Sequence, residues 1–137
     1  MNFMEEKLLS EAEKIEETEE TKKENKKKRV EALKKKYKEE GGKVYEVTTS
    51  VQVDDDTEEE FAFLFRKPKT ASYDRYVKTI SNSATKASKS FVFDNIIEEQ
   101  KGELKDTMEE YPAITISLAD KLLRMLGLAD TTSVKKL

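Results

Sequence analysis

The stretch that decides the fold is "KVYEVTTSVQVDDDTEEEFAFLFR", residues 43–66. Apolar and polar side chains alternate through its first half, as they do along a half-buried strand. The second half repeats the alternation, with Phe61, Phe63 and Phe65 on one face. The polar connection between the halves, residues 54–57, is short enough for a hairpin turn. We therefore predict an antiparallel β-hairpin.

After this hairpin the apolar spacing changes from two to the helical three and four. Four short helices are predicted, with these apolar stripes: Tyr73, Tyr76, Val77 and Ile80; Ala84, Ala87, Phe91 and the Ile96-Ile97 pair; Leu104, Met108 and Tyr111; and Ile114, Leu118, Leu122 and Met125. The predicted boundaries are Thr70 as an N-cap, a second cap within Ser81–Ser83, a break at Gly102, Pro112 as a first helical residue and a stop at Gly127. Strands followed by helices predict an α+β fold.

The phenylalanine face of the hairpin needs a cover, because a two-stranded sheet is marginal alone. We expect Tyr73, Tyr76 and Val77 to pack over this face. Because so few strands are predicted, both edges of the hairpin are expected to be open. An open edge is either covered or pairs with another chain, so a homo-oligomer is compatible with the pattern.

The chain before the hairpin is highly charged, with 21 charged residues among the 30 of residues 11–40. Neither proline nor glycine occurs before Gly41, so a long solvated helix is expected. Its apolar residues form two separate groups and do not fill successive heptads, which excludes a coiled coil through its middle. The predicted organisation is a charged helical extension (1–40), a core domain (41–128) and a flexible tail (129–137).

The composition excludes several kinds of site. The chain has no cysteine and no histidine, so disulfides, Ser–His or Cys–His catalytic pairs and thiolate or imidazole zinc sites are absent. The acidic "DDDTEEE" turn lacks the alternating ligands and the glycine of a calcium loop. No enzyme activity, metal or cofactor is expected. The chain has no run of about 18 apolar residues and no secretory signal, so a cytoplasmic protein is expected.

Several motifs in the hairpin and helices resemble those of small tail proteins of phages and prophages, the tail assembly chaperones and a related family. They are the Phe-rich "FLFRKP", the "YDRYVKT" helix start, "FVFDNII", the "EEYP" junction and a leucine-rich last helix ending "LLRMLGL". The likeness covers Tyr45–Leu128. Ile114, Thr115 and Ile116 depart from the pattern, and the charged segment before the hairpin is not part of it.

This resemblance implies a non-enzymatic chaperone that coats the long helical tape-measure protein while a phage tail polymerises. Such a partner would lay an apolar helix face against the domain, and helix recognition uses anchors at spacing three and four. The predicted partner-binding residues, on the last helix and on the helix after the hairpin, are Leu118, Leu122, Met125, Tyr73 and Tyr76.

Two alternatives stay open at this point. The first is a structural component of the virion, such as a tail or head–tail connector protein. The second is a nucleic-acid-binding protein that uses the basic residues 22–38. A solvated helix explains these lysines better, because no aromatic residue interrupts Lys26–Arg29 to stack on a base. Tyr73 and Tyr76 as acid–base residues are a weaker interpretation than core or interface positions.

Overall fold

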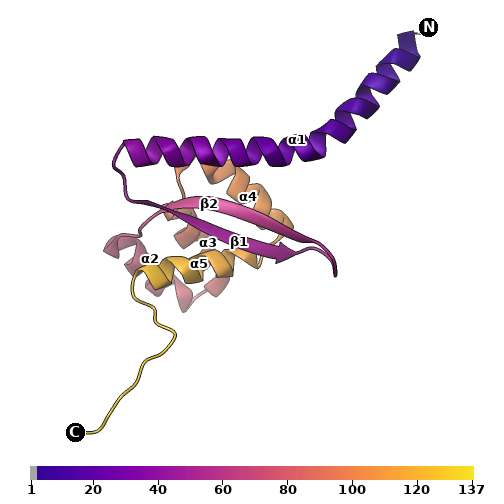
Figure 1. Cartoon of the computed structure of the whole chain (residues 1–137). Coiled ribbons are helices and arrows are strands. Elements are labelled where there is room, and N and C mark those ends of the chain that lie inside the picture. The colour runs from indigo at the N-terminus through magenta and orange to yellow at the C-terminus, as the bar shows by residue number, and fades with distance from the viewer. Residues whose placement is uncertain (1–2) are drawn as a thin grey trace. The chain divides into compact units, whose positions relative to one another are not determined.

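The chain divides into two compact units, Met1–Gly41 and Gly42–Leu137. The computed structural model describes the backbone of residues 3–137 and the side-chain surroundings of residues 21–137. In chain order the elements are α1 (Phe3–Glu39), β1 (Val44–Gln52), β2 (Glu58–Arg66), α2 (Thr70–Ile80), α3 (Ala84–Asn95), the 3-10 helix η1 (Glu98–Gln100), α4 (Lys101–Glu110) and α5 (Ile114–Met125) (Figure 1). The second unit is therefore an α+β domain in which a hairpin precedes its helices, as predicted.

Helix α1 lies in the first unit. Its described turns are dominated by charged side chains, and Lys34 pairs with Glu31 one turn away at 2.9 Å. Gly41 ends the helix with a positive φ of 71°, which confirms the predicted glycine cap. The predicted apolar group of Leu8, Leu9, Ala12 and Ile15 lies outside the residues whose side chains the structure describes.

The predicted antiparallel hairpin forms, and its register places Val47 opposite Phe63. The strands pair antiparallel from Val44 opposite Arg66 to Gln52 opposite Glu58. At the tip, the Asp54 carboxylate accepts a hydrogen bond from the Asp56 amide at 2.9 Å. This bond and that of the Thr57 hydroxyl hold the pKa of Asp54 below its usual value. The acidic turn is thus organised by its own backbone.

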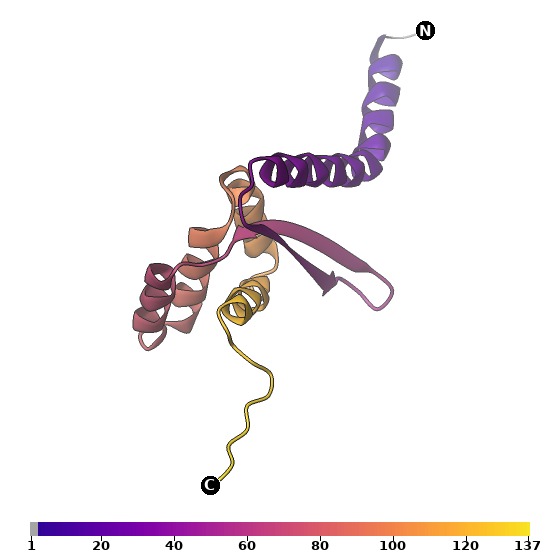
Figure 2. The same ribbon diagram turned by 60° about the vertical axis from the view of Figure 1, so that its left-hand side comes forward.

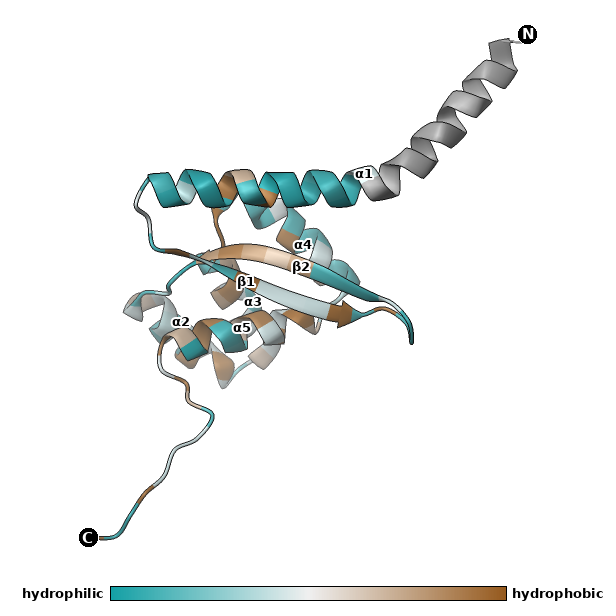
Figure 3. Ribbon diagram, viewed as in Figure 1, coloured by the Kyte–Doolittle hydropathy of each residue, from teal (hydrophilic) through white to brown (hydrophobic). Residues whose placement is uncertain are grey.

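The core lies on the phenylalanine face of β2. Phe63 and Phe65 have no exposed surface and Phe61 is buried beside them. Helices α3, α4 and α5 cover this face, as the two views in Figures 1 and 2 show. In Figure 3 the central part of β2 is correspondingly coloured as hydrophobic. The side chains that these helices contribute to the core are Phe91, Val92, Leu104, Met108, Ile114, Leu118, Ala119 and Leu122.

The outer edge of β2 is covered by the segment that follows α3. Ile96 forms an isolated antiparallel bridge with Phe65, and the Ile97 amide donates to the Leu64 carbonyl at 3.0 Å. The predicted placement of Ile96 and Ile97 in a helix is therefore wrong. Their backbone is extended because it satisfies hydrogen-bonding groups at the sheet edge, which a helix would leave unpaired.

The side chain of Gln100 completes this edge. Its Oε1 accepts from the Leu64 amide at 2.6 Å, and its Nε2 donates to the Ala62 carbonyl at 3.1 Å. Gln100 is fully buried. One amide side chain thus replaces the backbone of a neighbouring strand along two residues of β2. Every buried side-chain nitrogen and oxygen in the described part of the chain has a hydrogen-bond partner.

Local capping chemistry explains some helix boundaries. Ser83 caps α3, with its hydroxyl accepting from the Lys86 amide at 3.2 Å, and Gly127 follows α5 with a φ of 109°, both as predicted. Thr70, the predicted N-cap of α2, is instead its first helical residue. Lys69 occupies the N-cap position, and its side chain makes no capping hydrogen bond.

Two further boundary predictions are wrong. Gly102 lies inside α4, because the break comes earlier, where Ile96 and Ile97 leave the helix to pair with β2. Pro112 lies in a turn two residues before α5, whose Ile114 amide donates to the Tyr111 carbonyl at 3.1 Å.

Tyr111, in the "EEYP" junction, ties the end of α4 to the hairpin. Its ring lies 5.8 Å from that of Phe61, and its hydroxyl donates to the Glu59 carboxylate at 3.3 Å. Burial raises the pKa of this half-buried phenol, and the charges of Glu110 and Glu59 raise it further. The junction residue is therefore a structural contact in this domain.

We expect Tyr111 to stabilise the fold in a pH-dependent way. Its folded pKa is raised, so its contribution is complete below the ordinary phenol value of about 10 and is lost as pH rises through the folded pKa. Melting curves of the wild type and Tyr111→Phe between pH 8 and 11 should therefore converge at the alkaline end. A gap of constant size would show that the hydroxyl does not titrate in this way.

Candidate binding surface

Helix α2 exposes three large apolar side chains on one line. Tyr73, Val77 and Ile80 are 41%, 46% and 41% exposed, and their spacing of four and three residues places them on one helix face. We call these three residues the α2 stripe. An apolar helix face directed to solvent is the kind of surface that marks an interaction site.

The stripe is exposed because α2 packs on α3 through a different face. Ser72 of α2 is buried, and its hydroxyl accepts a hydrogen bond from Nδ2 of the buried Asn95 at 3.1 Å. The same Nδ2 donates to the Phe91 carbonyl at 2.7 Å, and Ala87 is also buried in this contact region. Small and polar residues thus turn inward and the bulky apolar ones remain outside.

This packing corrects the expectation that Tyr73, Tyr76 and Val77 cover the phenylalanine face of the hairpin. Tyr73 and Val77 are exposed, and Tyr76 is half-buried with its ring 4.9 Å from that of Phe91. The helices α3, α4 and α5 supply the cover instead. Helix α2 therefore has a face available to another molecule.

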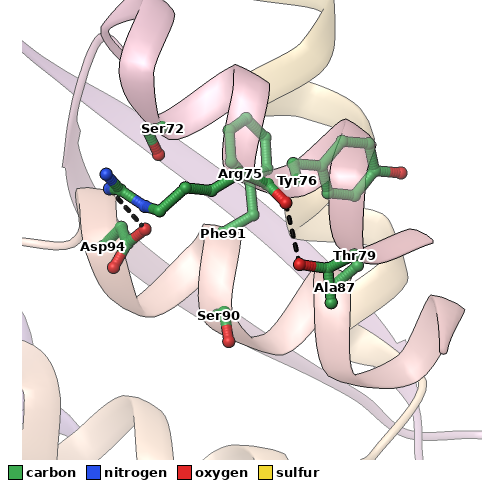
Figure 4. Close-up of a pocket in the computed structure, with 8 residues that line it drawn as sticks. All are labelled: Ser72, Arg75, Tyr76, Thr79, Ala87, Ser90, Phe91 and Asp94. Carbon is green, nitrogen blue, oxygen red and sulfur yellow. Dashed lines mark hydrogen bonds and ion pairs between the residues drawn. The ribbon is translucent and has the colours of Figure 1, made fainter. Parts of the chain in front are cut away.

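A groove of about 230 Å³ lies between α2 and α3 (Figure 4). The Arg75 guanidinium of α2 pairs with the Asp94 carboxylate of α3 at 3.0 Å across it. The Thr79 hydroxyl donates to the Arg75 carbonyl at 2.8 Å. The Arg75–Asp94 ion pair thus joins α2 and α3 across the groove. The residues that line it are Ser72, Arg75, Tyr76, Thr79, Ala87, Ser90, Phe91 and Asp94.

The structure separates the five residues predicted to bind a partner. Leu118 and Leu122 have no exposed surface and belong to the core, so a partner cannot touch them in this conformation. Met125 is partly buried against the same core. Tyr73 is exposed, and Tyr76 lies at the edge of the groove. Only the two tyrosines therefore lie together on one surface.

Sequence reasoning placed Val77 and Ile80 on the correct helix stripe but assigned that stripe to the core. A signal for the other orientation is present in the sequence. The face with Ser72 and Thr79 is small and polar, and it meets an α3 face that carries Ala87 and Ser90. Small residues on two successive helices allow close approach, which leaves the bulky side chains outside.

The surroundings of the stripe are basic. Residues 66–90 contain seven Lys or Arg and a single Asp, although the whole chain has a net charge of −3. Lys69 lies four residues before Tyr73, and Lys78 lies between Val77 and Ile80; both are exposed. An apolar stripe with a basic border favours a partner that carries apolar anchors and acidic residues.

Among the residues that the structure describes, no cluster of acidic side chains is arranged to hold a metal ion. None of the described helices is both long and apolar enough to span a bilayer.

The fold and this surface define a small α+β domain with an exposed, basic-bordered helix stripe. The chain belongs to the family described as Domain of unknown function (DUF6848), whose model matches residues 33–135. The uncharacterised protein rbstp2171 from Bacillus stearothermophilus has a similar solved structure, with a TM-score of 0.62 and 32% identity. That match covers 77% of this chain and 99% of the other. No curated protein matches this chain. The family match begins at residue 33 and so takes in only the end of α1.

Proposed function

We propose that this protein is a non-enzymatic tail assembly chaperone that binds the helical tape-measure protein of a phage. The observation that carries the proposal is the α2 stripe, in which Tyr73, Val77 and Ile80 offer apolar anchors at helical spacing. The resemblance of the motifs in Tyr45–Leu128 to tail assembly chaperones supplies the identity of the partner.

The partner helix binds along α2. Its apolar face contacts the stripe, and its flank fits the edge of the groove at the half-buried Tyr76. The leucines of α5 remain in the core and hold the domain together, because they have no exposed surface. The proposed interface therefore lies on α2 and not on the last helix. Tyr73 and Tyr76 remain proposed contact residues for the partner.

The charged extension, residues 1–40, serves this function as a solubilising helix. Its high charge keeps a complex soluble while many copies bind one long apolar partner. Residues 1–32 lie outside the family match, which agrees with an accessory role for most of the extension.

Co-expression with the tape-measure protein encoded beside this chain tests the proposal. We expect the two proteins to co-purify at moderate and at high salt, because an apolar interface is weakly screened. Val77→Asp should abolish co-purification, since it buries a charge in the contact. The matched control is Ile116→Asp, which changes another exposed apolar residue, 67% exposed and on α5, and should leave co-purification unchanged.

Three other outcomes contradict the proposal. Association that is lost at high salt would favour contact through the basic residues 22–38. Absence of association at both salt levels, together with recovery of this chain from purified virions, would favour a structural component. Equal loss of binding in both aspartate variants would show that α2 is not the contact surface.

A further inference from the structure

The α2 stripe matches a segment of the chain's own sequence. Residues 5–20 carry Leu8, Ala12 and Ile15, whose spacing of four and three residues is the spacing of Tyr73, Val77 and Ile80. We propose that the acidic segment 5–20 of a second copy of this chain binds the α2 stripe, so that the free protein self-associates. This inference goes beyond the proposed function and does not depend on it.

The apolar anchors of the two segments are complementary in size. Aligned helix to helix, each of the three residues of the segment meets one residue of the stripe. Ala12 is small and falls opposite Val77, so it allows the two helices to approach closely at the centre of the contact. Leu8 and Ile15 then pack on Tyr73 and Ile80, the outer residues of the stripe. They can do so whether the two helices run parallel or antiparallel, because the spacings of four and three residues are nearly equal.

The charges of the two segments are also complementary. Residues 5–20 contain eight Glu and two Lys, whereas residues 66–90 contain seven Lys or Arg and one Asp. On the segment, Glu11 and Glu16 border the apolar line by their helical positions. On the domain, the exposed Lys69 and Lys78 border the stripe. Opposite charges around an apolar centre orient such a contact. Repulsion between like charges disfavours the pairing of two acidic segments with each other.

The length of the extension favours a second copy over the same chain as the source of the segment. Residues 21–39 of α1 are helical, and a helix of this length spans roughly 28 Å at 1.5 Å per residue. Neither glycine nor proline interrupts the sequence before Gly41. A second copy can present its segment without a bend in this helix. Exchange of segments between two copies uses each stripe once and closes a two-fold dimer.

This contact gives the exposed stripe an occupant when no other partner is present. An apolar line left in water favours non-specific association, and a reversible intermolecular cover limits it. Because the cover is part of the chain, its concentration rises with that of the protein. Any other ligand of the stripe then has to displace the segment, so the apparent affinity of the stripe for that ligand is lower than for an unoccupied stripe.

Sedimentation velocity of the full chain across a micromolar concentration series tests the inference. We expect a reversible dimer that dissociates on dilution and weakens at high salt. Val77→Asp should weaken self-association by about tenfold or more, because it places a charge in an apolar contact. Ile116→Asp, the matched control, should self-associate like the wild type. Thermal melting followed by circular dichroism verifies that each variant is folded.

A charge exchange identifies the segment itself. Glu11→Lys combined with Glu16→Lys should weaken the dimer several-fold, and Lys69→Glu combined with Lys78→Glu should do the same. The four changes together should restore it, because they reverse both borders. A monomeric wild type, a dimer that survives Val77→Asp, or the absence of rescue in the fourfold variant would each overturn the inference. None of these results decides binding to the tape-measure protein, which the co-purification measures separately.

Discussion

Phe63→Ala is expected to lower the free energy of unfolding by about 3–5 kcal/mol, the usual cost of deleting a fully buried aromatic side chain. Phe63 has no exposed surface and lies in the centre of the hairpin's inner face, with the Phe61 ring stacked at 6.5 Å. Helices α3, α4 and α5 converge on this face and close the cavity only partly after truncation. A small domain of marginal total stability would therefore be largely unfolded at elevated temperature.

Urea denaturation followed by far-UV circular dichroism measures this effect. The matched control is Ile116→Ala, an apolar truncation at a residue that is 67% exposed, which we expect to change stability by less than about 0.5 kcal/mol. A Phe63→Ala variant as stable as this control would mean that the phenylalanine face is not the core of the folded domain.

The second large effect is expected at Gln100, whose side chain takes the place of a third strand. Gln100→Met has a similar volume but leaves the Leu64 amide and the Ala62 carbonyl without their partner. Each unsatisfied buried group costs about 1–3 kcal/mol, so we expect the two groups together to lower the free energy of unfolding by about 2–6 kcal/mol. Hydrogen exchange of the Leu64 amide should accelerate in the same variant, because its protecting bond is gone.

Gln100→Glu separates the loss of hydrogen bonds from the loss of shape. A buried glutamate has a folded pKa raised above its unfolded value of about 4.3, since burial disfavours its charge. Its protonated form can still donate to the Ala62 carbonyl, so stability is best below the unfolded pKa and falls as pH rises through the folded one. Denaturation at pH 4 and pH 7 should show this difference. A variant equally stable at both pH values would place residue 100 in contact with water.

Binding of the tape-measure protein and self-association are both proposed to use Tyr73, Val77 and Ile80 of α2, but they require different partners. The proposed chaperone role requires that a long apolar helix bind the stripe, whereas the proposed self-association requires only the chain itself. Val77→Asp affects both, and Ile116→Asp affects neither. Glu11→Lys combined with Glu16→Lys changes the segment and leaves the stripe and its basic border unchanged, so this variant separates the proposed self-association from the proposed binding of the tape-measure protein.

The sequence by itself determined the elements whose formation depends on neighbouring residues. Alternation at spacing two is a property of the strand backbone, and it predicted both strands of the hairpin and their turn. The caps at Ser83, Gly41 and Gly127 also follow from local chemistry, a hydroxyl that accepts from an amide and glycines that tolerate a positive φ. These predictions held because no distant residue competes for the same groups.

The tertiary structure alone decided how the elements use their faces. Ile96 and Ile97 leave the helix because the edge of β2, some 30 residues earlier in the chain, offers hydrogen bonds to their backbone. The face that α2 turns toward α3 carries Ser72, which is hydrogen-bonded to Asn95, 23 residues away. A helical stripe has the same sequence pattern whether it meets a core or solvent, so only these distant contacts place Tyr73, Val77 and Ile80 on the surface.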